Sequence, residues 1–131
     1  MGIGQELARH LADSGSDVYL LDIAGEEVAA AADELGATGL VCDVRSTADV
    51  DSAVTRAVAD TGRVDIIVNN AGILSDHRLW RLSDEDWEEV LASHLGGTFR
   101  LTRAATPALR AQEYGRVINR TSYTGLHGNV G

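Results

Sequence analysis

Two glycines and one aspartate near the start of the chain have the residue types and spacing that could hold a dinucleotide. Gly2 and Gly4 flank Ile3 and directly precede a stretch with helical periodicity. Glycines there let the backbone approach a pyrophosphate, whose charge is stabilised by a helix N-terminus. Asp22 follows 18 positions after Gly4, close to the spacing at which an acidic side chain accepts hydrogen bonds from a ribose. The pattern predicts a nucleotide site, with capping of the next helix as the alternative role for Asp22.

Two further groups of polar residues follow predicted strands. Asp43 could accept a hydrogen bond from an adenine amino group while the N–H of Val44 reaches a ring nitrogen, or it could cap the helix that begins after Ser46. The tetrapeptide Asn69-Asn70-Ala71-Gly72 places two amides and two very small residues at the end of another strand. Small residues permit close approach of a ligand, and amides can satisfy backbone groups where a sheet opens. An ordinary turn is the alternative, since Asn and Gly favour turns.

The elements that must position these residues alternate between helix and strand. Apolar periodicity predicts strands over residues 17–23, 38–44, 64–69 and 116–121, and helices over residues 5–14, 26–35, 46–61 and 84–112. The last helix should bend near Gly96, Gly97 or Pro107, and residues 125–131 should form a loop. Such alternation indicates α/β architecture with a doubly wound parallel sheet. A phosphate-binding glycine turn normally leaves a strand, whereas this chain opens on the turn itself.

Composition narrows the classes of function. The formal net charge is −9, with 20 acidic residues against 11 basic ones and no lysine. This acidity argues against binding to nucleic acid or to a membrane surface. Cys42 is the only cysteine, so an internal disulfide is impossible, and packing is its expected role. The histidines lack metal-ligand spacing, so no metal site is predicted. With no leader or apolar run of membrane-spanning length, we expect a cytoplasmic protein of one domain.

The order and spacing of five motifs resemble the short-chain dehydrogenase/reductase family. These motifs are Gly2-Ile3-Gly4, the strand-end Asp22, Cys42-Asp43-Val44, the Asn-Asn-Ala-Gly tetrapeptide and the stretch from Arg116 to Ser122. The resemblance spans the whole chain, and the tetrapeptide is its most specific element. Residues 70–97 look most like 3-oxoacyl carrier-protein reductases and the 3-hydroxyacyl-CoA dehydrogenase domains of multifunctional β-oxidation enzymes.

The resemblance implies that residues 1–131 form a partial NAD(P)-binding Rossmann-like domain, truncated at both ends. The family moves a hydride between nicotinamide and a carbonyl or alcohol carbon, here expected on a 3-oxoacyl or 3-hydroxyacyl thioester or a similar small molecule. NAD is expected over NADP, because the carboxylate of Asp22 repels a 2′-phosphate. Relatives commonly form tetramers, which makes a homo-oligomer the expected assembly. The implied cofactor-binding residues are Gly2, Ile3, Gly4, Asp22, Ile23, Asp43, Val44, Asn70, Ala71 and Gly72.

The catalytic set implied by the resemblance is incomplete. Ser122 matches the family serine that hydrogen-bonds the substrate oxygen, although a serine in a strand-end turn would look the same. His94 stands where the family usually has Asn, and it could instead be a structural residue bonded to water or backbone. The family's Tyr-x-x-x-Lys pair would fall just past Gly131. Each tyrosine of this chain lacks a lysine four residues later, so the acid/base pair is missing and this chain alone should be inactive.

The resemblance also makes a prediction about the sheet. The family's strand order is 3-2-1-4-5-6-7, and strand 1 would be missing here. A gap of roughly 10 Å should then separate two inner edges with unpaired backbone groups, giving weak stability and poor affinity for NAD. A non-catalytic nucleotide-binding or interaction module remains an alternative function. A phosphoacceptor receiver domain ranks last, because it needs an acidic pair after the first strand and a lysine after the fifth.

Overall fold

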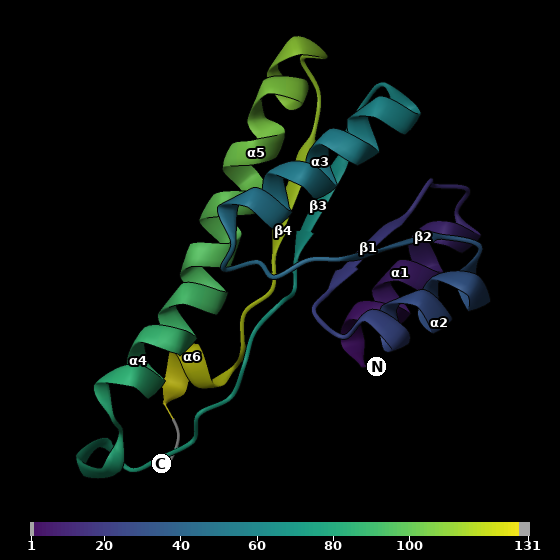
Figure 1. The fold of residues 1–131 in the computed structure, drawn as a ribbon. Helices are drawn as coiled ribbons and strands as arrows, with labels where there is room; N and C mark the ends of the chain where they lie inside the picture. The colour runs from purple at the N-terminus through teal and green to yellow at the C-terminus, as the bar shows by residue number, and fades with distance from the viewer. Residues whose placement is uncertain (1, 129–131) are drawn as a thin grey trace.

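The computed structural model describes residues 2–128, which alternate between helices and short parallel strands (Figure 1). The first part of the chain forms α1 (Ile3–Asp13), β1 (Tyr19–Asp22), α2 (Gly25–Leu35), β2 (Thr38–Val41) and α3 (Thr47–Thr61). The second part forms β3 (Ile66–Asn69), the 3₁₀ turn η1 (Leu79–Arg81), α4 (Asp84–Leu91), the π-helical turn η2 (Ala92–Gly96), α5 (Gly97–Ala111), β4 (Arg116–Asn119) and α6 (Thr124–His127).

The strands form two separate parallel pairs. β1 pairs with β2, with Tyr19 opposite Thr38, and β3 pairs with β4, with Ile66 opposite Arg116. Among residues 2–128, no ladder joins one pair to the other. In Figure 1, α1 and α2 accompany the β1–β2 pair, while α3 and α5 accompany β3 and β4. This arrangement confirms the predicted partial Rossmann-like α/β fold.

The main core holds the two pairs together through α3. Val50 and Ala53 of this helix are buried beside Cys42, and Val50 is 0% exposed. Apolar side chains from both sides of the molecule pack against this cluster, namely Leu21, Leu40, Leu101 and Ala104. The first two come from β1 and β2 and the last two from α5. The core therefore bridges the two sheets on one face.

Local signals in the sequence set several helix boundaries as expected. The Ser46 hydroxyl accepts a hydrogen bond from the N–H of Asp49 at 3.3 Å, which caps α3. Ser83 and Asp86 form a reciprocal capping box at the start of α4, with N···O distances of 3.1 and 3.2 Å. Gly62 ends α3 with a φ of 74°, a left-handed conformation that glycine adopts without steric penalty.

Other boundaries differ from the predictions. The strands contain only four residues each, since each ladder pairs only four positions. The helix predicted over residues 84–112 is interrupted by the π-helical turn, which Arg100 braces by donating to the carbonyl of Ala92 at 3.3 Å. The loop predicted over residues 125–131 was partly wrong, since α6 forms with Tyr123 stacked on His127. Residues 129–131 lie outside the described residues.

Candidate functional site

The predicted binding residues lie at the carboxyl ends of the parallel strands. Asp22 ends β1 opposite Val41 of β2, and its carbonyl accepts from the N–H of Cys42 at 2.9 Å. This pairing places Asp22 and the Asp43 loop at neighbouring strand ends. Asn69 ends β3 opposite Asn119 of β4 in the same way. In open parallel sheets, ligands bind outside this edge.

The glycine turn from Gly2 to Gly4 lies directly beside the tetrapeptide Asn69-Asn70-Ala71-Gly72. Gly2 precedes α1 with a φ of 137°, a conformation that favours glycine. A Cβ atom at Gly4 would stand only 2.7 Å from Nδ2 of Asn70, so a larger residue would collide with the amide. The N-terminus of α1, with the positive end of its dipole, therefore lies beside the end of β3.

Asp22 is exposed at the end of β1, next to Ile23, which is 62% exposed. One carboxylate oxygen of Asp22 accepts a hydrogen bond from the N–H of Ala24 at 3.0 Å. Ala24 is itself the N-cap of α2, so Asp22 stabilises the turn before the helix without being its cap residue. A carboxylate has about four acceptor positions, and this single bond leaves acceptor capacity for a ribose.

Arg45 engages Asp43, an interaction that the sequence reasoning missed. Nε and Nη2 of Arg45 donate to the two oxygens of Asp43 at distances from 2.9 to 3.1 Å. Hydrogen bonding from Arg45 lowers the pKa of the Asp43 carboxyl, which keeps it ionised. An adenine amino group would compete with Arg45 for this carboxylate. The signal available in the sequence was a basic residue two positions after Asp43.

Helix α5 fixes the position of the loop that carries Val44. A Cβ atom at Gly97 would lie 2.9 Å from Cγ2 of Val44, so the glycine permits close packing of the helix on the loop. On the other side of the loop, the N–H of Asp43 donates to Asp49 at 3.1 Å. Both contacts hold the loop backbone, which is the part expected to reach an adenine ring.

The two asparagines after β3 have different partners. Nδ2 of Asn69 donates to Oδ1 of Asn119 at 2.8 Å, which ties the ends of β3 and β4 together. Oδ1 of Asn70 accepts from Arg120 at 3.0 Å, while its Nδ2 faces Gly4. Arg120 was quoted in the sequence only as part of a motif, and its contact with Asn70 was not predicted.

His94 lies in the π-helical turn, and its ring covers Gly72. A Cβ atom at Gly72 would overlap this ring, so the glycine and the histidine fit only together. Nε2 of His94 is 3.1 Å from the nitrogen and 2.9 Å from the oxygen of Ile73. The ring nitrogen can accept from the former or donate to the latter, according to its tautomer. His94 therefore holds the loop after β3.

Ser122 lies just beyond the carboxyl end of β4 and is exposed. Its hydroxyl oxygen is 2.9 Å from the Thr124 hydroxyl and accepts from the Thr124 N–H at 3.3 Å. Arg120, two residues earlier, donates its N–H to the carbonyl of Asn69 at 3.0 Å. Ser122 therefore lies at the same end of the β3–β4 pair as Asn69 and Asn70.

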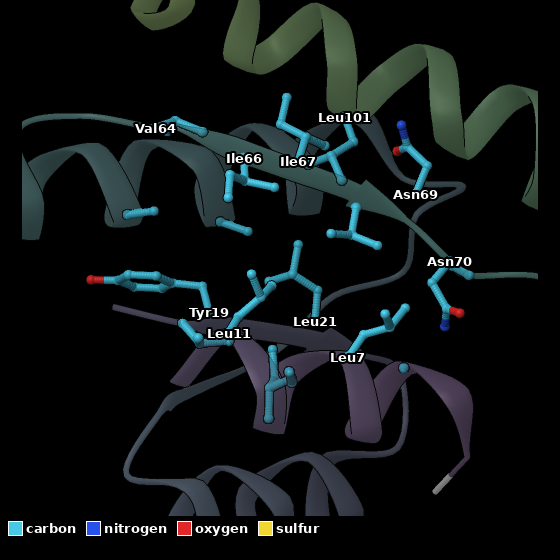
Figure 2. Close-up of a pocket in the computed structure, with 18 of the residues that line it drawn as sticks. Leu7, Leu11, Tyr19, Leu21, Val64, Ile66, Ile67, Asn69, Asn70 and Leu101 are labelled. Atoms are coloured by element: carbon cyan, nitrogen blue, oxygen red, sulfur yellow. The ribbon is translucent and has the colours of Figure 1, made fainter. Parts of the chain in front are cut away.

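A cavity of about 920 Å³ separates β1 from β3 (Figure 2). Apolar side chains line most of it, including Leu7 and Leu11 of α1, Leu21 of β1 and Ile66 of β3. At the carboxyl end of the strands it reaches Gly4, Asp22, Val44, Asn70 and Ala71. The predicted gap between two inner strand edges is therefore a lined cavity. Among residues 2–128, no cluster of three potential metal ligands occurs, and no helix is long and apolar enough to cross a membrane.

Comparison with known proteins decides the family. The sequence model of the short chain dehydrogenases matches residues 1–131. The chain belongs to the short-chain dehydrogenase family. This family comprises oxidoreductases that use NAD or NADP, so the resemblance seen in the five motifs is confirmed.

Similar members of the short-chain dehydrogenase family are longer proteins. Peroxisomal multifunctional enzyme type 2 of Drosophila melanogaster is 38% identical over 99% of this chain and 24% of its own length. The 3-oxoacyl-[acyl-carrier-protein] reductase FabG of Escherichia coli K12 is 37% identical over 99% of this chain and 54% of its own length. The chain thus spans about half of the reductase and a quarter of the multifunctional enzyme.

A solved structure extends the likeness to three dimensions. A Phe-to-Trp variant of actinorhodin polyketide ketoreductase, crystallised with NADPH, superposes with a TM-score of 0.95. It is 34% identical, and the match covers 98% of this chain and 52% of that one. Because that enzyme was solved with NADPH, the likeness does not favour NAD over NADP.

Proposed function

We propose that this chain supplies the cofactor-binding half of an oxidoreductase that acts on a 3-oxoacyl or 3-hydroxyacyl thioester. The close approach of Gly4 to Asn70 is the observation that supports this proposal most directly. It brings the positive end of the α1 dipole to the strand edge that also carries Asp22 and Asp43. A dinucleotide lying along this edge would supply or accept the hydride at its nicotinamide ring.

Each part of the edge has a role in the proposal. The backbone from Gly2 to Gly4 holds the pyrophosphate, and Asp22 accepts hydrogen bonds from the adenosine ribose. The loop of Asp43 and Val44, with Ile23 beside it, contacts the adenine. Asn70, Ala71 and Gly72 flank the adenosine, and the small Ala71 leaves room for it, while the His94 ring covers Gly72.

NAD is the cofactor that we propose, because of the charge at Asp22. This exposed carboxylate would repel a 2′-phosphate, and the Arg45 guanidinium, which could otherwise attract one, is held by Asp43. Calorimetric titration of NAD and NADP into the chain tests the choice. Asp22→Asn should reduce the preference for NAD by roughly tenfold, the value of one lost charge-assisted hydrogen bond, and Asp33→Asn on α2 serves as a control away from the edge. If the unchanged chain and Asp22→Asn show the same ratio of NAD affinity to NADP affinity, the proposed role of Asp22 is contradicted.

Turnover requires more than this chain, according to our proposal. Ser122 would position the substrate oxygen by donating its own O–H, because Thr124 donates to the Ser122 oxygen and leaves that proton available. The chain has no lysine to lower the pKa of a catalytic tyrosine. We therefore expect no hydride transfer by the 131-residue chain in a spectrophotometric assay with 3-oxoacyl thioesters. Measurable turnover would contradict this expectation.

A non-catalytic nucleotide-binding module is the alternative function. The observation that favours it is that His94, at the position of the family's Asn, is bonded to the backbone of Ile73. A longer product with a tyrosine and lysine after residue 131 discriminates between the functions. NAD binding with hydride transfer in that product supports the oxidoreductase, whereas binding without transfer supports the alternative.

A further inference from the structure

The carboxylate of Asp43 is occupied by its neighbour Arg45. We propose that Arg45 thereby removes the 6-amino group of the base from recognition, so that the loop accepts purine dinucleotides with or without that group. This role rests on the nucleotide site proposed above and adds to it the residue that sets selectivity for the base. Arg45 is a positioning residue in this scheme, because it acts through Asp43 and does not itself contact the dinucleotide.

Arg45 makes four donor contacts with the two oxygens of Asp43. Oδ1 accepts from the backbone N–H of Arg45 at 2.8 Å and from its Nε at 3.0 Å. Oδ2 lies 3.1 Å from the same Nε and accepts from Nη2 at 2.9 Å. A carboxylate has about four acceptor positions, so Arg45 alone uses nearly all of this capacity. By contrast, Asp22 at the neighbouring strand end accepts one bond, from Ala24.

Displacement of Arg45 by a base would be unfavourable. The backbone N–H of Arg45 belongs to the loop itself, so its contact with Oδ1 persists even when the side chain moves. An adenine amino group is a neutral donor, and it could replace only the guanidinium contacts of a bidentate ion pair, which are among the strongest hydrogen bonds in proteins. The guanidinium is also held on its other side, where Nη1 lies 3.8 Å from Oε1 of Glu89 on α4.

With Asp43 occupied, the backbone of Val44 is the group left to recognise the base. Among residues 2–128, the N–H of Val44 donates to no protein atom, so it is available to a ligand. It can donate to N1 of a purine, which is an acceptor whether or not the 6-amino group is present. The close packing of Gly97 on the Val44 side chain gives this N–H a defined position.

The experiment compares two dinucleotides that differ only at the 6-amino group. The ¹⁵N-labelled 131-residue chain is titrated with NAD and with nicotinamide purine dinucleotide, which lacks this group, and both affinities are taken from the NMR shift of the Val44 amide. We expect the two affinities to be equal. In Arg45→Ala, Asp43 regains vacant acceptor positions, and NAD should bind roughly tenfold more tightly than the purine analogue, the value of one hydrogen bond to a charged acceptor.

The ratio of the two affinities separates selectivity from folding. A loss of stability in Arg45→Ala weakens both ligands equally and leaves the ratio unchanged. A clear preference for NAD in the unchanged chain overturns the proposal, as does a ratio that Arg45→Ala leaves at one. Arg56→Ala is the matched control, because it breaks a similar pair with Asp60 on α3, and it should not alter the ratio.

Two further measurements identify the groups that contact the base. Adding Asp43→Ala to Arg45→Ala should return the ratio to one, and a preference that persists would overturn the proposal by showing that another group reads the amino group. The hypoxanthine dinucleotide carries a proton on N1, so it should bind more weakly than the purine analogue, and equal binding would overturn the role of Val44. If none of the dinucleotides binds, the nucleotide site is refuted and this inference with it, whereas binding with the wrong ratios refutes this inference alone.

Discussion

The contact between Gly4 and Asn70 can be tested by adding one methyl group. In Gly4→Ala, the new Cβ would stand 2.7 Å from Nδ2 of Asn70, well inside van der Waals contact. The amide of Asn70 can relieve this only by rotating, which breaks its 3.0 Å hydrogen bond from Arg120. That bond contributes about 1 kcal/mol, and an unrelieved overlap costs about 1–3 kcal/mol.

The same methyl group is favourable where nothing obstructs it. Alanine replaces glycine in a helix with a gain of up to about 1 kcal/mol, less in the first turn. We therefore expect Gly4→Ala to destabilise the chain by about 1 kcal/mol, measured by urea unfolding. In an Asn70→Ala background, which removes the obstructing amide, the same substitution should be neutral or stabilising. The resulting coupling free energy is about 1–2 kcal/mol.

Gly125→Ala provides the matched control for this double-mutant cycle. The nearest atom to a Cβ at Gly125 is the Thr121 hydroxyl at 3.5 Å, an ordinary contact, so its effect should add to that of Asn70→Ala. If Gly4→Ala and Asn70→Ala are additive within about 0.5 kcal/mol, the two residues are not in the contact described. The placement of the glycine turn on the strand edge would then be refuted.

Three further outcomes are expected from local interactions. Because Arg45 lowers the pKa of Asp43 below its ordinary value of 3.8, their stabilising interaction is present above that value and is lost as pH falls through the lowered pKa. Arg45→Gln should return the Asp43 pKa toward 3.8 in an NMR titration, and an unchanged pKa would exclude Arg45 as the cause. Ser83→Ala removes the capping box and should cost about 1 kcal/mol in urea unfolding, while an unchanged midpoint would mean that the cap contributes nothing. Burial raises the pKa of the Cys42 thiol, so Cys42 should react with a thiol reagent only at the rate of unfolding; rapid modification of the folded chain would contradict its burial.

Much of the fold could be predicted because its signals are local. Ser46 and Ser83 start their helices through contacts three residues away, and Gly62 ends α3 through its own backbone conformation. The parallel pairing within β1–β2 and β3–β4 followed from the alternation of helical and strand periodicities. These features need no knowledge of what lies elsewhere in the chain.

The features that the sequence did not predict depend on contacts between residues far apart in the chain. The approach of Gly4 to Asn70 and the bond from Arg120 to Asn70 join segments that no local pattern connects. A bend of the long helix near Gly96 was predicted, but neither the π-helical turn nor the bond between His94 and Ile73 was. The sequence pattern identified which residues lie at the carboxyl ends of the strands. Which of these residues contact one another could be learned only from the folded structure.

The π-helical turn sets the rotational phase between α4 and α5. Each residue of an α-helix advances the chain by about 100°, and a π-helical turn accommodates one additional residue. The turn absorbs this residue, so α4 keeps the phase in which Asp86 accepts from the Ser75 hydroxyl at 3.1 Å. Deleting one residue from 92–96 should therefore give an unbroken α-helix of nearly the same phase. Inserting one more residue into an α-helical stretch would instead turn α4 by about 100° around the shared axis.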